Sequence, residues 1–185
     1  MSEAELEYLP STIGVRGGAD DVVLLAIARN EILRMPFFLE YYRSRGVTDF
    51  VIIDNCSNDG TFEYLQNQVD VSVVHTTLPY KVLENRWRND VANKYFNEKW
   101  VLFADIDELL IFPGDGRVGL PALCRWWRDH EAYVVPSPMI DMYSNRPLEN
   151  VEYIAGSLSG KLQTALTLMG TDLFRLLRRH PALCY

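Results

Sequence analysis

Cysteine and histidine are both scarce in this sequence, with three of each among 185 residues. The cysteines, Cys56, Cys124 and Cys184, lie far apart and form no C-x-x-C pair. That spacing indicates neither a cysteine zinc site nor a disulfide framework. Reduced thiols in a cytoplasmic protein are the simplest interpretation, and we expect a cytoplasmic location.

Long apolar runs and an excess of positive charge are also missing. No run approaches the roughly 18 apolar residues that are typical of a transmembrane helix, and the first ten residues lack the apolar core of a signal peptide. The net charge is -7, with 18 Lys and Arg against 25 Asp and Glu. This acidic balance argues against nucleic-acid binding, which needs clustered basic residues. The glycine-rich fingerprints of P-loop and dinucleotide-binding proteins are absent as well.

Apolar runs that fit buried strands alternate with segments of helical spacing. We expect strands at residues 22–28, 50–53, 71–75, 100–104 and 132–135, and helices at residues 32–44, 61–68, 84–97 and 120–130. This alternation predicts an α/β fold with a mostly parallel sheet and helices on both faces. The expected domain covers residues 20–150, after a leader at residues 1–19 and before a helical tail at residues 151–185.

Three polar clusters follow three of the predicted strands. ARNE (28–31) follows the first strand, DNCSNDGT (54–61) the second and DIDE (105–108) the fourth. In a parallel sheet all three lie at the carboxyl edge, where ligands bind. Simpler interpretations exist for the first two: Asn30 and Glu31 fit the start of a helix, and Asp59-Gly60 fits an ordinary turn.

The acidic cluster DIDE is harder to explain without a ligand. Asp105, Asp107 and Glu108 stand within four positions, between the apolar runs WVLFA and LLIF. Carboxylates this close repel one another and resist burial. Mg²⁺ and Mn²⁺ prefer such hard oxygen ligands and are commonly held by one or two carboxylates together with substrate phosphates. The cluster therefore predicts a divalent cation that is shared with a diphosphate.

In this order, the segments ARNE, IIDNCSNDGT, RWRND and WVLFADIDELLIF resemble the family 2-like glycosyltransferases of the GT-A fold. The resemblance covers about residues 20 to 145. It implies a Rossmann-like nucleotide-sugar-binding domain at residues 20–150. It also implies transfer of a sugar from a nucleotide donor, expected to be a UDP-sugar, to an acceptor hydroxyl.

The resemblance also implies roles for single residues. The residues that it places in the nucleotide-sugar pocket are Ala28, Arg29, Asn30, Glu31, Asp54, Arg88 and Asp105. For Arg88, a solvated helix face is an equally good interpretation. The implied cofactor is Mn²⁺ or Mg²⁺, with Asp105 as a ligand and Asp107 as the principal one. Glu108 completes the family-like D-x-D-E pattern and is expected to orient its loop.

The end of the sequence departs from the family pattern. Such enzymes usually continue well past the metal motif with an acceptor-binding part and a carboxylate base. Here residues 136–145 resemble the next strand and acceptor loop, and Asp141 is the nearest candidate base. The acceptor stays open between a saccharide, a lipid-linked group and a protein. The tail matches nothing expected, so it is interpreted as truncated or altered. Its apolar face fits either docking on the body or peripheral contact with a membrane.

Three other functions compete with the transferase interpretation. A nucleotide-sugar-binding remnant or scaffold would keep the donor pocket without catalysing transfer. A haloacid-dehalogenase-like phosphatase would also use D-x-D after a strand, but on its first strand and with a small hydroxyl residue afterwards. Here Glu108 and Leu109 follow, on about the fourth strand. A nucleotidyltransferase would want a glycine-rich loop after the first strand, and ARNE has no glycine.

Overall fold

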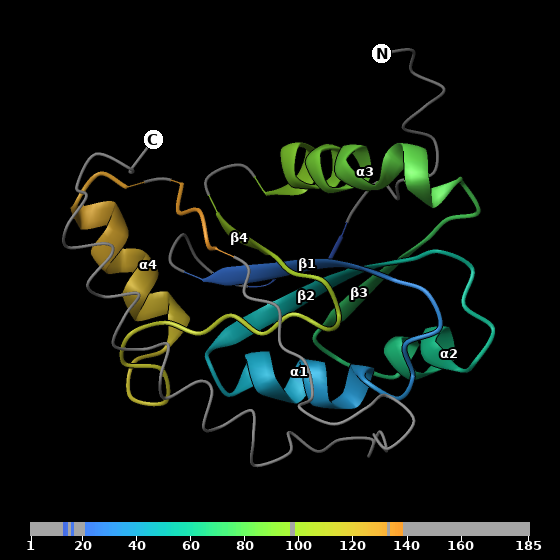
Figure 1. Cartoon of the computed structure of the whole chain (residues 1–185), viewed down its shortest axis with the longest axis horizontal. Coiled ribbons are helices and arrows are strands. Elements are labelled where there is room, and N and C mark those ends of the chain that lie inside the picture. The colour runs from blue at the N-terminus through green and yellow to red at the C-terminus, as the bar shows by residue number, and fades with distance from the viewer. Residues whose placement is uncertain (1–12, 15, 17–20, 97–98, 133, 139–185) are drawn as a thin grey trace, which may run out of the picture.

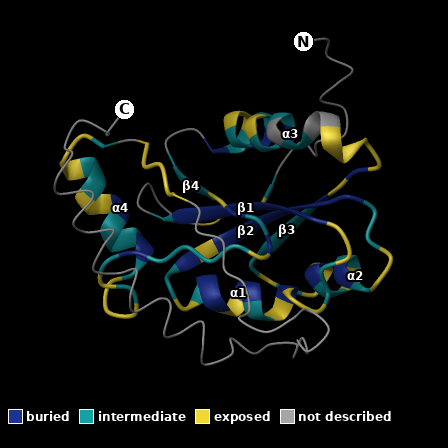
Figure 2. Ribbon diagram, in the orientation of Figure 1, coloured by how far each residue is buried: buried dark blue, intermediate teal, exposed yellow. Residues whose placement is uncertain are grey.

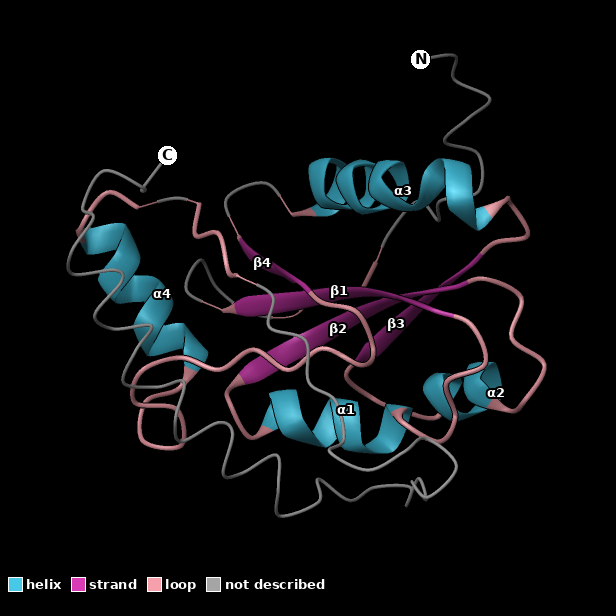
Figure 3. Ribbon diagram, in the orientation of Figure 1, coloured by secondary structure: helices cyan, strands magenta, loops and turns pink. Residues whose placement is uncertain are grey.

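The residues that the structure describes have an α/β fold built on a four-stranded parallel sheet with the order β3-β2-β1-β4. The computed structural model describes residues 13–14, 16, 21–96, 99–132 and 134–138. Figures 1 and 3 show helix α3 on one side of the sheet and helices α1 and α2 on the other. The prediction of a Rossmann-like α/β fold is confirmed.

Strand β1 (Val22–Ala28) lies inside the sheet and is buried along its whole length. Because side chains alternate along a strand, the run VVLLAIA supplies two cores at once. Leu24 and Ala26 belong to the core beneath α1, whereas Leu25 and Ile27 belong to the core beneath α3. Figure 2 shows this buried strand at the centre of the molecule.

The neighbouring strands start at different points but bring their ends close together. Strand β2 (Val47–Asp54) pairs with β1 so that Asp54 stands opposite Ala28. Strand β3 (Val71–His75) pairs with β2 so that His75 stands opposite Asp54. Strand β4 (Trp100–Phe103) pairs with β1 as far as Leu25. Since all four strands run in one direction, the loops after them meet at one edge of the sheet.

The helices cover both faces of the sheet. Helices α1 (Met35–Arg43), α2 (Thr61–Gln66) and α4 (Leu120–Asp129) contribute buried residues to one core. Helix α3 (Tyr80–Tyr95) contributes Trp87 and Val91 to the other core. None of the helices within the described ranges is long and apolar enough to cross a membrane.

The predicted helices and strands are present, with ends that differ by a few residues, except for one predicted strand. Pro36 lies in the first turn of α1, where proline is well tolerated. Gly46 ends the connection after α1 with a φ of +88°, and a side chain there would meet Pro121. The strand predicted at residues 132–135 is wrong for residues 132, 134 and 135, which are not in a strand. The prediction rested on apolar residues alone. In the described part of the chain, no strand pairs with this segment.

Candidate functional site

The loops after β1 and β2 are tied together by side chain to backbone hydrogen bonds. The Asn30 N–H donates to Ser57 Oγ over 2.9 Å, and Asn30 Oδ1 accepts the Asn58 N–H over 2.8 Å. The Glu31 N–H donates to Thr61 Oγ1 over 2.8 Å. ARNE and DNCSNDGT therefore form one interlocked unit, which the sequence showed only as two separate clusters.

Asn30 has a different role from the helix cap that its sequence context allowed. Its φ is 60°, in the left-handed region that asparagine tolerates better than most residues. Helix α1 begins only at Met35, with Arg34 as its N-cap, and has no acidic residue in its first turn. Glu31 instead forms an ion pair with Arg34 over 2.7 Å. The interpretation of Asn30 and Glu31 as a helix start is therefore wrong.

Asp59 holds the second loop in shape. Its carboxylate accepts the Thr61 hydroxyl over 2.6 Å, the Thr61 N–H over 3.0 Å and the Ile32 N–H over 3.2 Å. Partial burial opposes the ionisation of Asp59, but these hydrogen bonds outweigh it and lower the pKa of the carboxyl. The charged carboxylate therefore stabilises the turn that joins the two loops.

Asp54 is completely buried at the end of β2. Its Oδ2 atom accepts the Ser57 N–H over 3.2 Å and lies 3.0 Å from Nδ1 of His75. Its Oδ1 atom is buried and has no hydrogen-bond partner within the described residues. His75 is half exposed, and its ring packs edge-on against Phe62. Asp54 thus holds the loop through Ser57 and also contacts His75. The sequence gave no reason to place His75 beside Asp54.

The DIDE segment forms a tight turn after β4. The Asp105 N–H donates to Oε2 of Glu108 over 3.0 Å, and the Glu108 N–H donates to the Asp105 carbonyl over 2.9 Å. Ile106 points into the core and is 6% exposed, whereas Asp107 is exposed. Arg88 of α3 forms an ion pair with Asp105. Arg88 therefore contacts the acidic cluster, and a purely solvated helix face does not describe it.

A cavity of about 570 Å³ opens between the ends of β1 and β4 and the start of α3. Its lining consists of Ile27, Ala28, Arg29, Glu31, Pro79, Tyr80, Lys81, Asp105, Ile106 and Asp107. This volume is within the range of small-molecule sites. Five of the predicted site residues, namely Ala28, Arg29, Glu31, Asp105 and Asp107, come together here. Asn30, Asp54 and Arg88 are not part of the lining.

The charges around this cavity divide into paired and unpaired groups. Glu31 pairs with Arg34 and Asp105 pairs with Arg88. Within the described part of the chain, the side chains of Arg29, Lys81 and Asp107 have no hydrogen-bond or ion-pair partner. Two cations and one carboxylate are therefore free to meet a ligand that itself carries both negative charge and a bound cation.

Pro79, Tyr80 and Lys81 are lining residues that sequence reasoning missed. They lie at the start of α3, which begins at Tyr80, four residues before the predicted start at residue 84. Tyr80 packs edge-on against the buried Trp87, and partial burial together with Glu84 raises the pKa of the Tyr80 hydroxyl. A signal was present in Pro79, because proline commonly precedes or opens a helix.

No protein-family model matches this chain, and no curated protein matches it. The residues and the geometry of the site therefore indicate what it can bind.

The donor set of the cavity fits a divalent cation that is shared with a ligand. No group of three or more His, Cys, Asp and Glu side chains within the described ranges is arranged to hold a metal ion. Asp105 and Asp107 do, however, both line the cavity. Two carboxylate donors suit Mg²⁺ or Mn²⁺ when phosphate oxygens and water complete the coordination. Asp141, the candidate base, and the tail at residues 151–185 lie outside the described residues.

Proposed function

We propose that the protein is a metal-dependent glycosyltransferase that moves a sugar from a nucleotide donor, a UDP-sugar, to an acceptor hydroxyl. The observation that carries the proposal is one cavity at the carboxyl edge of a parallel sheet. There, the unpaired cations Arg29 and Lys81 face the cavity together with the carboxylates Asp105 and Asp107. A nucleoside diphosphate with a divalent cation has the complementary charges.

Each wall of the cavity has a distinct task in this proposal. Arg29 and Lys81 attract the diphosphate, since exposed cations at a cleft raise the local concentration of an anionic ligand. Asp105 and Asp107 would hold the cation, and the ion pair with Arg88 holds the Asp105 side chain at the cavity. Tyr80 offers an aromatic face beside Lys81 against which a sugar or base can pack.

The chemistry needs stabilisation of a departing nucleoside diphosphate. Asp105 and Asp107 would hold a divalent cation there, and that cation would supply charge stabilisation for the leaving group. Arg29 and Lys81 line the same cavity and add positive charge to this region. The acceptor hydroxyl attacks the anomeric carbon as the bond from that carbon to the diphosphate oxygen breaks. The diphosphate leaves with the bonding electron pair, and the hydroxyl proton passes to a general base, for which Asp141 is the candidate from the sequence.

Titration calorimetry with UDP tests the proposal. We expect clearly tighter UDP binding with Mn²⁺ than with a chelator, because two carboxylates alone hold the cation poorly. Equal affinity in both conditions would refute the metal assignment. Binding of UDP-sugars without transfer to any of a panel of saccharide, lipid-linked and peptide acceptors would favour a binding module over a transferase.

A further inference from the structure

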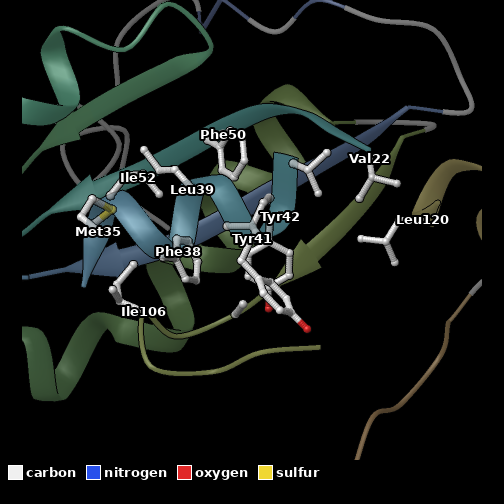
Figure 4. Packing of buried hydrophobic residues seen from close by; sticks show 14 of the residues in the cluster. Val22, Met35, Phe38, Leu39, Tyr41, Tyr42, Phe50, Ile52, Ile106 and Leu120 are labelled. Atoms are coloured by element: carbon white, nitrogen blue, oxygen red, sulfur yellow. The ribbon is translucent and has the colours of Figure 1, made fainter. Parts of the chain in front are cut away.

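Helix α1 sends two tyrosine hydroxyls out of the core toward the segment that follows the acidic cluster. Figure 4 shows the rings of Tyr41 and Tyr42 among the apolar side chains of this core, with their oxygen atoms close to each other. Tyr42 is 0% exposed and Tyr41 is 6% exposed. Phenylalanine fills such a position equally well, so the hydroxyl groups need an explanation of their own.

Both hydroxyls bind the backbone just after DIDE. The Tyr42 hydroxyl donates to the Glu108 carbonyl over 3.0 Å and accepts the Leu110 N–H over 3.0 Å. The Tyr41 hydroxyl donates to the Leu110 carbonyl over 2.9 Å. Burial raises the pKa of Tyr41 to about 12 and that of Tyr42 further. Both groups therefore stay protonated at neutral pH and keep donating.

Glu108 links Tyr42 to the residues that line the cavity. Its carbonyl is held by Tyr42, and its carboxylate accepts the Asp105 N–H over 3.0 Å. Asp105 and Asp107 both line the cavity, whereas Tyr42 does not. A continuous path of hydrogen bonds thus runs from the buried hydroxyl through Glu108 to the backbone that carries the two aspartates.

Helix α1 is also fixed at its other end to the opposite wall of the same cavity. The Glu31 carbonyl accepts the N–H groups of Arg34 and Met35 over 3.0 and 2.8 Å. Between these points the helix packs in the core, with the Phe38 ring edge-on to Tyr42 at 5.0 Å between centroids. One short helix therefore sets the separation between the ARNE loop and the DIDE turn.

We propose that Tyr42 is a positioning residue that holds Asp105 and Asp107 where they receive the divalent cation of a diphosphate ligand. The inference rests on the proposed function, but the hydrogen-bonded clamp itself can be measured without any ligand. Removing a group that orients a metal ligand without binding the metal itself commonly lowers metal affinity by 10- to 100-fold. Tyr42 would act in this way through the backbone of the turn.

The test compares four variants, three that change Tyr42 or Glu108 and one control. Tyr42→Phe removes the hydroxyl and keeps the packed ring. Glu108→Ala removes the carboxylate that accepts the Asp105 N–H, and Glu108→Gln keeps an oxygen that can accept it. Ile52→Val is the matched control, because it removes one methyl group from the same core on strand β2.

Two readouts are taken at a temperature where every variant is folded. Calorimetry gives the ratio of UDP affinities with Mn²⁺ and with a chelator. Amide hydrogen exchange, with no metal or nucleotide, gives the protection of the Asp105 and Leu110 N–H groups. We expect Tyr42→Phe and Glu108→Ala to lower the affinity ratio about tenfold or more, while metal-free UDP affinity is unchanged. Exchange at Leu110 should speed up in Tyr42→Phe, and Glu108→Gln should recover most of the ratio that Glu108→Ala loses.

The outcomes separate this inference from the proposed function. An unchanged affinity ratio in Tyr42→Phe overturns the positioning role. An equal loss in Ile52→Val also overturns it, since that loss would reflect lower stability alone. If the wild-type protein shows no Mn²⁺-dependent UDP binding, the proposed function fails instead. In that case faster Leu110 exchange in Tyr42→Phe but not in Ile52→Val supports the clamp, and equal exchange in all proteins overturns it.

Discussion

Replacing Asp107 by asparagine should uncouple nucleotide binding from the metal while the fold survives. The side chain is exposed, lines the cavity and has no partner within the described part of the chain. Asparagine keeps its size and removes only its charge. Exposed substitutions away from packed or buried polar groups usually change the free energy of unfolding by less than about 0.5 kcal/mol.

The expected effect on the metal follows from the exposure of the site. Unit charges about 4 Å apart in water interact by about 1 kcal/mol, and a divalent ion doubles this to about 2 kcal/mol. Since about 1.4 kcal/mol corresponds to a tenfold change, Asp107→Asn should weaken Mn²⁺-dependent UDP binding by at least about 30-fold. Direct coordination brings the charges closer than 4 Å, so this figure is a lower bound.

Titration calorimetry with UDP, in Mn²⁺ and in chelator, measures this change. The matched control is Asp129→Asn, which removes an exposed carboxylate at the end of α4, outside the cavity lining. The control should behave like the wild-type protein. If Asp107→Asn keeps the wild-type difference between Mn²⁺ and chelator, Asp107 is not a ligand and the charge argument is wrong.

Three further changes test other parts of the arrangement. Lys81→Gln should weaken UDP binding about two- to fivefold, the usual strength of an exposed ion pair, and leave uridine binding unchanged. Lys94→Gln at the far end of α3 is the control. Equal losses of affinity for UDP and for uridine would show that Lys81 does not contact the phosphate. Thr61→Val deletes a buried hydroxyl that bridges Asp59 and the Glu31 N–H, so urea unfolding should show a loss of about 1–3 kcal/mol; a shift below about 0.5 kcal/mol contradicts the interlock. The hydrogen bonds from Arg43 lower the pKa of Asp70 below 3.8, so their stabilisation is present above that pH and disappears as the pH falls through the folded-state pKa. The stability difference between the wild-type protein and Arg43→Met should therefore shrink below about pH 3.8, and a difference that is constant with pH would contradict this pairing.

The sequence predicted the sheet because its strands are buried on both faces. A run such as VVLLAIA has no polar residue to satisfy, so burial on both sides of a sheet is its simplest environment. The convergence of ARNE and DIDE at the cavity followed from the parallel direction of the strands. Ends of helices were less predictable: α3 starts at Tyr80 because Pro79 opens it, although its first turn has no apolar periodicity.

Contacts between loops could not be predicted from the sequence. Thr61 bonds the Glu31 N–H, and Tyr42 bonds the Glu108 carbonyl, across 30 and 66 positions of the chain. Hydroxyl groups carry no pattern that reveals such partners, because a tyrosine at helical spacing looks like any other core residue. Lys81 was missed for a related reason, since an isolated lysine normally belongs to the solvated surface.

The position of β1 inside the sheet has a consequence for the order in which the chain can fold. Its partner β2 follows soon after it, but its other partner, β4, is made only when residues 100–103 have left the ribosome. Until then, one edge of the most apolar strand in the described sheet has no partner, and unpaired apolar edges associate with other chains. Slow translation between residues 55 and 100 should therefore favour aggregation, even though β4 covers this edge as far as Leu25 in the finished sheet.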